Sequence, residues 1–580
     1  MEDIKNQNES LYTIINGKIY TANENNDFEE SMILLNNKIV FIGSLEKSKQ
    51  FIANNNIDVQ KVKLIEIDSN QLIVPGFIDS HIHPMIGKVF EDTLTISECK
   101  SPQDIIDTIK DYMNSNKDKN FIVAAGYIDT MFTEEDPVHF KTIDKISKEI
   151  PILLTRNDGY AYLCNSPLLK LANITKDTPS PQGGWIQVNK EGELEGVCHD
   201  SAMALIHRVM PKFSIDAKHD ILNSCLNHLM SIGITGFMDA AVKACNFEVY
   251  KHMYSDEEVS WKLPRCSLSI LLKRSYIYTQ IDDAEDEKAP DTVEFNLFQI
   301  DEFFKKNRIK DWWNNKLKVN TVKLFIDGVF ESGTGSFRKC NCGMEDNEED
   351  IPYTFNKEEL QILIDYFYSN DIQIHSHSVG DLASKMMLDA IEESKKKFKD
   401  KENTERNYLA HLQLLPYEDI KRMADLKVHA NMTPFWFKQD SFSESFHKFI
   451  GNHRLNEIYP IKTMIDMGVN IGFGSDWPVT TPVPLEGIEV AVTHRALGET
   501  SDKPIYNQNH IISLYDAVKA YTIGSAKILG LDHLVGTLEV GKLADLVILS
   551  KNIFDIPTWE IHRVKVLTTM IDGKITYIEH

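Results

Sequence analysis

An apolar stretch that ends on two histidines constrains this chain more than any other feature. Residues 72–83 read Leu-Ile-Val-Pro-Gly-Phe-Ile-Asp-Ser-His-Ile-His, which is typical of a buried strand. Alternate residues of a strand point to the same side, so we expect His81 and His83 to project together from its carboxyl end. One metal ion could bind both. A bare His-x-His is more often two histidines satisfied within a loop, so the rest of the chain must supply further ligands.

The middle of the chain alternates predicted strands with predicted helices. After the opening strand, seven more apolar runs follow, at 234–239, 266–272, 321–328, 372–377, 408–413, 428–432 and 469–476. Repeated βα units predict a parallel sheet, and eight of them predict an α/β fold with a closed (β/α)8 TIM-type barrel. We assign this domain to residues 72–530. The segments 84–213 and 274–318 exceed ordinary loop lengths and are predicted to be insertions.

Each end of the chain contains a similar β-hairpin motif. Ile15-Asn-Gly-Lys-Ile19 and Ile571-Asp-Gly-Lys-Ile575 each place a turn dipeptide between apolar residues. Neither end contains enough predicted strands to form a stable domain alone. Residues 1–71 and 531–580 are therefore predicted to build one small β-sandwich together.

Composition narrows the classes of partner. The 580 residues include 62 lysines and arginines against 86 acidic residues, a net charge of −24, which opposes binding to nucleic acid or to an anionic membrane. The first thirty residues lack signal-peptide features, and no apolar run approaches the roughly 18–20 residues of a membrane span. Eight scattered cysteines favour a reducing compartment. We expect a cytoplasmic protein that acts on a small molecule. Cys340 and Cys342 lack a second nearby pair and are not favoured as a metal site.

Polar residues follow the predicted barrel strands where a barrel places its chemistry, at the carboxyl ends. Lys323 lies on the fourth strand, His377 on the fifth, His411 on the sixth and Asp476 after the eighth. Together with the first two histidines they form a set of imidazoles and one carboxylate. Such a set suits zinc or a similar divalent ion.

Six phrases, in order along the chain, resemble the amidohydrolase superfamily and, more narrowly, its YtcJ-like family, which includes N-substituted formamide deformylases. The phrases are Pro75-Gly-Phe-Ile-Asp-Ser-His-Ile-His-Pro84, Val322-Lys-Leu-Phe-Ile-Asp-Gly328, His377-Ser-Val-Gly-Asp381, Ala410-His-Leu-Gln413, Gly474-Ser-Asp-Trp-Pro-Val479 and Gly536-Thr-Leu-Glu-Val-Gly-Lys-Leu-Ala-Asp-Leu546. They span nearly the whole chain.

The resemblance implies a site for one or two divalent ions, with zinc expected. His81 and His83 would hold one ion with Asp476, and His377 and His411 would hold a second. Binding by a single ion remains an alternative.

The resemblance also implies that Lys323 bridges the ions. An ammonium has no lone pair for a metal, so this role requires carbamylation by CO2 and, before that, a lowered pKa. The alternative is an ion pair with a carboxylate such as Asp327. His375 lies two residues before His377 but outside the family phrase, so we expect it beside the site and not among the ligands.

The implied activity is hydrolysis of a C–N bond in a small non-peptide amide, formamide-like or an N-acyl amine. A metal pair lowers the pKa of water toward about 7, and Asp476 would act as general base and then general acid, with Lys323 as the other catalytic residue.

A deaminase, an esterase or a carbamate hydrolase would use nearly the same site. The competing class is an inactive scaffold or regulatory protein. By resemblance alone we expect a homodimer.

Candidate substrate contacts come from two segments. Tyr160 stands where the family phrase normally has histidine, and it could donate a hydrogen bond to a carbonyl oxygen. Phe435 and Trp436 follow the seventh strand, where they either line an aromatic pocket or pack a loop together with Phe437.

Overall fold

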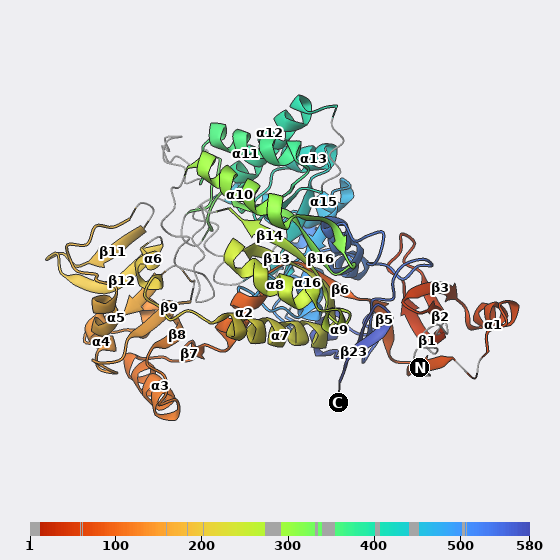
Figure 1. Cartoon of the computed structure of the whole chain (residues 1–580), viewed down its shortest axis with the longest axis horizontal. Coiled ribbons are helices and arrows are strands. Elements are labelled where there is room, and N and C mark those ends of the chain that lie inside the picture. The colour runs from red at the N-terminus through yellow and green to blue at the C-terminus, as the bar shows by residue number, and fades with distance from the viewer. Residues whose placement is uncertain are drawn as a thin grey trace. The chain divides into compact units, whose positions relative to one another are not determined.

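The computed structural model in Figure 1 describes most of the chain. The described residues are 12–579, except for 59, 61, 158, 160, 182–183, 201, 273–291, 331–333, 339–353, 401–405, 440–449, 451, 502–504 and 506. Tyr160, Cys340 and Cys342 therefore lie outside the described residues, and the predictions about them stay predictions.

Eight parallel strands form the wall of a barrel, which confirms the predicted α/β TIM-type fold. In order around the wall they are β6 (Phe77–Ile82), β13 (Ile234–Val242), β14 (Arg265–Leu271), β16 (Leu317–Phe325), β17 (Gln373–Ser378), β18 (Tyr408–His411), β19 (His429–Met432) and β20 (Ile471–Phe473). Each pairs in parallel with the next along the chain. A further strand, β15 (Ile309–Trp313), pairs antiparallel with β16. The side chains of the eight wall strands are almost entirely buried because helices cover the outside of the wall.

Backbone hydrogen bonds beyond the strand ends join the last strand to the first. The amide of Asp476 donates to the carbonyl of His81 at 2.7 Å, and the amide of His83 donates to the carbonyl of Trp477 at 3.0 Å. Below them, the Ser80 hydroxyl donates to the Phe473 carbonyl at 2.9 Å. Residues from opposite ends of the barrel sequence therefore meet at one rim.

The opening apolar run is two strands and not the single strand predicted. β5 (Leu72–Pro75) pairs with strands of the chain ends, and β6 enters the barrel. Gly76 separates them, and its amide donates to the Asp545 carbonyl at 2.9 Å. A Cβ at this position would lie 2.2 Å from Thr235 Oγ1, so the crossing from one sheet to the other requires glycine.

Strands from both chain ends share one sheet. Its order is β23 (Lys574–Ile578), β22 (Val566–Ile571), β21 (Leu546–Leu549), β5, β1 (Tyr12–Tyr20), β2 (Phe28–Leu35) and β3 (Lys38–Gly43), with β4 (Lys63–Glu66) also on β1. Ile15, Ile73 and Leu546 belong to the buried core that the two ends build jointly. The joint sheet is established, whereas its arrangement as a two-layered sandwich stays a prediction.

The chain divides into two compact units, of which the larger contains the barrel and the joint sheet. Its helices are α1 (Leu45–Asn54), α8 (Phe247–Ser255), α9 (Glu257–Ser260), α10 (Val293–Asn307), α11 (Lys357–Ser369), α12 (Asp381–Lys397), α13 (Tyr417–Leu426), α15 (Ile461–Asp466), α16 (Pro484–Thr493), α17 (Leu514–Lys519) and α18 (Ser525–Leu529). The longer ones present one buried apolar face, as packing against a barrel requires.

The second unit contains Met85–Leu222 and has a sheet and core of its own. The sheet order is β11 (Gly184–Val188), β12 (Leu194–Asp200), β10 (Ala161–Cys164), β9 (Ile152–Arg156), β8 (Ile122–Tyr127) and β7 (Leu94–Thr95). The associated helices are α2 (Pro84–Glu91), α3 (Pro102–Ser115), α4 (Phe140–Ile143), α5 (Ser166–Leu171) and α6 (Met203–His207), and α7 (Ile215–Ser231) leads back to β13.

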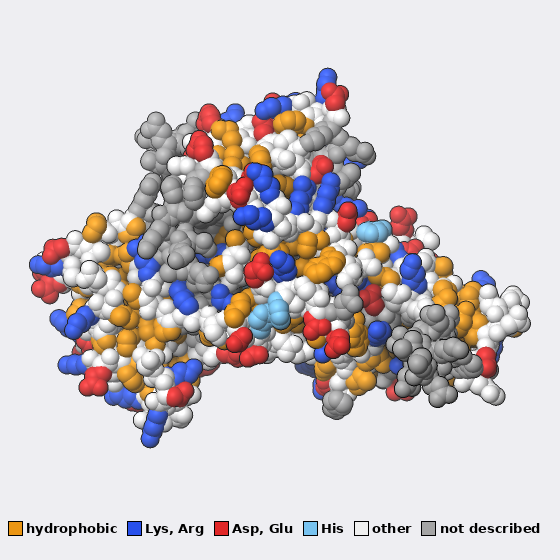
Figure 2. Space-filling model, viewed as in Figure 1, with side chains coloured by type: hydrophobic (Ala, Val, Ile, Leu, Met, Phe, Trp, Pro, Cys, Tyr) orange, Lys and Arg blue, Asp and Glu red, His pale blue; other side chains and the backbone are white. Residues whose placement is uncertain are grey.

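One face of the molecule carries both signs of charge. On the face shown in Figure 2, lysines and arginines are interspersed with aspartates and glutamates. Among the described residues, no helix combines the length and the apolar character needed to cross a membrane.

A buried ionic network links the barrel wall to the joint sheet. Arg265, at the start of β14, is fully buried, and its guanidinium donates to both carboxylate oxygens of Asp545 at 2.9 Å. The same guanidinium donates to Asp572 Oδ1 at 2.6 Å, and Lys316 Nζ lies 2.9 Å from Asp572 Oδ2. Removing one member would leave a buried charge without its partner.

We predict that Arg265→Met destabilises the protein by roughly 3–5 kcal/mol, because Asp545 would remain buried and uncompensated. The measurement is the midpoint of thermal unfolding. The control is Lys18→Met, which breaks an exposed 2.9 Å pair with Asp555 and should cost at most about 1 kcal/mol. Equal midpoints for the two variants would contradict the prediction.

Candidate metal centre

The structure brings all six predicted ligands to the carboxyl rim of the barrel. Each is buried, and each stands at or just beyond the end of a wall strand: His81 and His83 with β6, Lys323 on β16, His377 on β17, His411 on β18 and Asp476 after β20. They belong to five different strands, so only the closed fold makes them neighbours.

Asp476 lies between the first two histidines. Its Oδ1 is 3.4 Å from His81 Nε2 and 3.2 Å from His83 Nε2. The backbone of Asp476 has a φ of 54°, in the left-handed region that non-glycine residues rarely adopt. Such a conformation persists only where surrounding contacts enforce it, and here the closing hydrogen bond to His81 does so.

His411 connects the two expected groups of ligands. Its ring centroid is 4.8 Å from that of His81 and 4.5 Å from that of His377. One ligand atom each from His81, His411 and Asp476 lie within 4.8 Å of one another, so this triad draws on both groups. Within the described part of the chain, the buried Nδ1 of His411 has no hydrogen-bond partner.

Lys323 reaches into the same cluster from β16. Its Nζ is 3.5 Å from His81 Nε2 and 3.1 Å from His375 Nε2. Burial lowers the pKa of this amine to about 7, and the nearby Asp476 carboxylate offsets only part of that effect. Near neutral pH much of Lys323 therefore carries a lone pair.

Asp327 contacts His377 and not Lys323, the partner considered in the sequence analysis. Its carboxylate lies 3.2 Å from His377 Nδ1 and accepts the amides of Val379 and Gly380 at 3.0 and 2.8 Å. The alternative of a Lys323–Asp327 ion pair is therefore wrong. Asp327 instead orients the imidazole of His377, as a carboxylate commonly does for a metal-binding histidine.

Three buried imidazoles, those of His81, His375 and His411, have pKa values that favour the neutral form. Burial, followed by the charge of Lys323, lowers the pKa of His81 and His375 well below the usual value. Burial and the neighbouring His377 do the same for His411. Neutral imidazoles, a carboxylate and a deprotonated amine are the donors that a divalent ion needs, so these residues fit such an ion.

Asp79 is a buried residue beside the cluster that the sequence analysis did not single out. Its buried carboxylate accepts the amide of His81 at 3.1 Å and the amide of Ser475 at 3.1 and 3.2 Å. Burial raises the pKa of Asp79 to about 7, although these hydrogen bonds oppose the shift. The period-two spacing of Asp79, His81 and His83 was a signal that could have found it.

The three aromatic residues after the seventh strand have separate environments within the short helix Pro434–Phe437. Trp436 lies against the site, with its ring 5.4 Å from that of His411. Phe435 is covered by Lys438 Nζ at 3.6 Å from the ring centroid, and Phe437 is buried against Phe473. A substrate wall formed by Trp436 is consistent with this arrangement.

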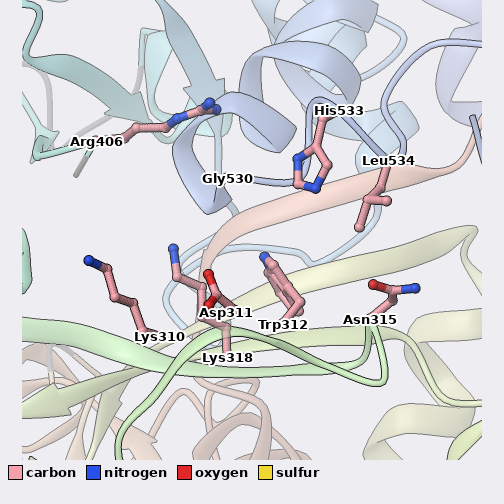
Figure 3. A pocket seen from close by; sticks show the side chains of 9 residues that line it. All are labelled: Lys310, Asp311, Trp312, Asn315, Lys318, Arg406, Gly530, His533 and Leu534. Atoms are coloured by element: carbon pink, nitrogen blue, oxygen red, sulfur yellow. The ribbon is translucent and has the colours of Figure 1, made fainter. Parts of the chain in front are cut away.

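A separate pocket of about 390 Å³ opens near the amino ends of the strands, beside the start of β16 and just before β18. Figure 3 shows Lys318 and Trp312 pointing into it from one side and His533 from the other. Two of its cations already have acidic partners, since Lys310 pairs with Asp371 and Arg406 with Asp532. The pocket lies away from the rim that carries the metal-binding cluster.

Comparison with known proteins decides the family. Residues 67–577 match the amidohydrolase family. The chain belongs to this family. Three curated relatives of this amidohydrolase align over 97% of its length. "Protein LONG AFTER FAR-RED 3" of Arabidopsis thaliana is 27% identical over 91% of its own length, "Putative amidohydrolase YtcJ" of Bacillus subtilis is 26% identical over 98%, and "N-substituted formamide deformylase" of Arthrobacter pascens is 23% identical over 98%.

Solved structures share the fold of this amidohydrolase. An uncharacterized metal-dependent hydrolase from Pyrococcus horikoshii OT3 superposes with a TM-score of 0.73 at 17% identity, covering 94% of this chain and 99% of that one. The family and the clustered donors support a metal-dependent hydrolase that uses a divalent ion.

We predict that Asp476→Asn and His411→Ala each lower zinc binding at least tenfold, because each removes a donor of the triad. The measurement is zinc content by elemental analysis after dialysis against a chelator and reloading. His429→Gln is the control, since His429 lies at the amino end of β19. Wild-type zinc content in both triad variants would contradict the prediction.

Proposed function

We propose that this amidohydrolase cleaves a C–N bond of a small non-peptide amide, formamide-like or an N-acyl amine, with zinc as the ion. The observation that carries the proposal is the contact of Asp476 with both His81 and His83 at the rim. This contact places the Asp476 carboxylate, which can accept and return a proton, next to two imidazoles that can bind a metal. The similarity to a formamide deformylase over nearly the full length of both chains supports the choice of substrate class.

The residues that would hold the ions are the six of the cluster. His81, His83 and Asp476 would form one group, and His377 and His411 would form the other, with Lys323 between them. When bound, zinc would polarise a carbonyl oxygen and lower the pKa of water at the site. The contact of His411 with both groups favours a compact centre.

Lys323 would join the centre as a carbamate. Its neutral Nζ would attack the carbon of CO2: an N–C bond forms, the electrons of one C=O π bond move to oxygen, and one N–H bond breaks to release a proton. The resulting carbamate would offer two oxygens as donors. The lysine is fully buried and its pKa is lowered to about 7, the two conditions that make an amine reactive and protect the product from acid.

Asp476 would accept a proton from the attacking water and return it to the leaving nitrogen. The Asp476 carboxylate is almost fully buried, so the protein and not bulk solvent governs the transfer. Trp436, beside His411, would form one wall for the substrate, and Tyr160 is retained as a proposed hydrogen-bond donor to the carbonyl.

Two other classes of function are distinguished by experiment. A deaminase, an esterase or a carbamate hydrolase would use the same centre, and the product released distinguishes them. A regulatory role without catalysis is the competing class, since one relative is called "Exoenzymes regulatory protein AepA". The presence of every predicted ligand at one rim favours the enzyme.

We expect the zinc-loaded protein to release amine from a formamide or an N-acyl amine in a panel that also contains carbamates, ureas and esters. Asp476→Asn should lower kcat by about 10²- to 10⁴-fold because it removes the proton acceptor. The control is Asp466→Asn, on the exposed side of α15, which should leave the rate unchanged. No turnover of any substrate by a folded, zinc-loaded protein would favour the regulatory class.

Carbamate formation on Lys323 should rise with pH around 7, because CO2 reacts with the neutral amine and protonation removes its lone pair. Carbon-13 NMR of the metal-free protein in labelled bicarbonate measures the carbamate directly across pH 5.5 to 8.5. Lys323→Arg is the control, since arginine stays protonated. A carbamate signal that persists in this variant would exclude Lys323 as its site.

A further inference from the structure

His375 is a buried histidine at the base of the cluster with no role in the proposed chemistry. It lies on β17 beside Lys323 of β16, and its ring stacks on that of Tyr408 of β18 at 4.4 Å. Its two nitrogens have different neighbours. Nε2 is 3.2 Å from His81 Nδ1 and 3.1 Å from Lys323 Nζ, whereas Nδ1 is 3.1 Å from Ser269 Oγ.

If His81 binds an ion, the nitrogen that carries the proton on each ring is determined, and so is the donor in each of these hydrogen bonds. The Nε2 of His81 faces Asp476 and is the nitrogen placed for the metal. The Nδ1 of the same neutral ring then carries the proton and must donate it. The acceptor within reach is His375 Nε2, so His375 carries its own proton on Nδ1 and donates it to Ser269.

From this relay we infer that His375 is a positioning residue, which fixes His81 with its Nε2 lone pair toward the ion. The inference rests on the proposed metal centre. Most metal-binding histidines are oriented by a carboxylate or a carbonyl, and here another imidazole does so, with the Ser269 hydroxyl behind it.

The inferred positioning role excludes a simpler role for His375, which is direct binding of the ion. The lone pair on His375 Nε2 is occupied by the proton of His81, so the same atom is not a seventh ligand. Glutamine separates the two roles because its amide oxygen reaches about as far as Nε2 and accepts a hydrogen bond, but it is a poor ligand for zinc. Leucine has a similar volume and accepts nothing.

The test is the affinity of full-length, metal-free protein for zinc, measured by competition with a chromophoric chelator in the presence of bicarbonate. We expect His375→Leu to bind zinc about 10- to 100-fold more weakly and His375→Gln to stay within about threefold of wild type. Ser269→Ala should weaken binding about 2- to 10-fold. The matched control is Ser267→Ala on the same strand, because the buried Ser267 hydroxyl has no hydrogen-bond partner within the described residues.

Each outcome decides the inference. Wild-type affinity in His375→Leu overturns it, and equal losses in the leucine and glutamine variants overturn it in favour of direct ligation. If His375→Leu does not fold, as judged by thermal unfolding of the metal-free protein, equal affinities of Ser269→Ala and Ser267→Ala overturn it. A wild-type protein that binds no zinc refutes the proposed function itself, and the inference with it.

Discussion

Closure of the barrel between its first and last strands is the constraint on which the site depends. Two backbone hydrogen bonds, Asp476 to His81 at 2.7 Å and His83 to Trp477 at 3.0 Å, join the chain just beyond the strand ends. The Asp79 carboxylate reinforces the junction by accepting amides from both sides. This junction turns Asp476 into the left-handed region and sets its carboxylate against two imidazoles. A barrel open at this seam would separate the carboxylate from the histidines.

Burial gives the cluster its chemistry. Exclusion of water lowers the pKa of His81, His411 and Lys323, because each loses the solvation of its charged form. Several lone pairs therefore face one another in a small volume, an arrangement that is unfavourable alone and favourable around a cation. The same loss of solvent explains why contacts such as His375 with His81 matter, since a buried donor left without an acceptor is costly.

The sequence predicts the barrel because its strands are buried on both faces and read as apolar runs. It also predicts the rim residues, because Lys323, His377, His411 and Asp476 each stand near the end of such a run. Contacts made by loops could not be predicted from the pattern of apolar runs. Asp327 pairs with His377 because the chain after β16 turns back toward β17, and no period in the sequence encodes that turn. The break at Gly76 was missed because two apolar strands joined by one glycine read as a continuous run.

The central claim is that the rim cluster binds a divalent ion through the carboxylate that closes the barrel. Crystals of the zinc-loaded protein, measured on both sides of the zinc absorption edge, test it most directly. The account predicts an anomalous peak about 2.0–2.2 Å from His81 Nε2, His83 Nε2 and an Asp476 oxygen. Zinc bound only elsewhere, or no peak at the rim despite excess zinc, would contradict it.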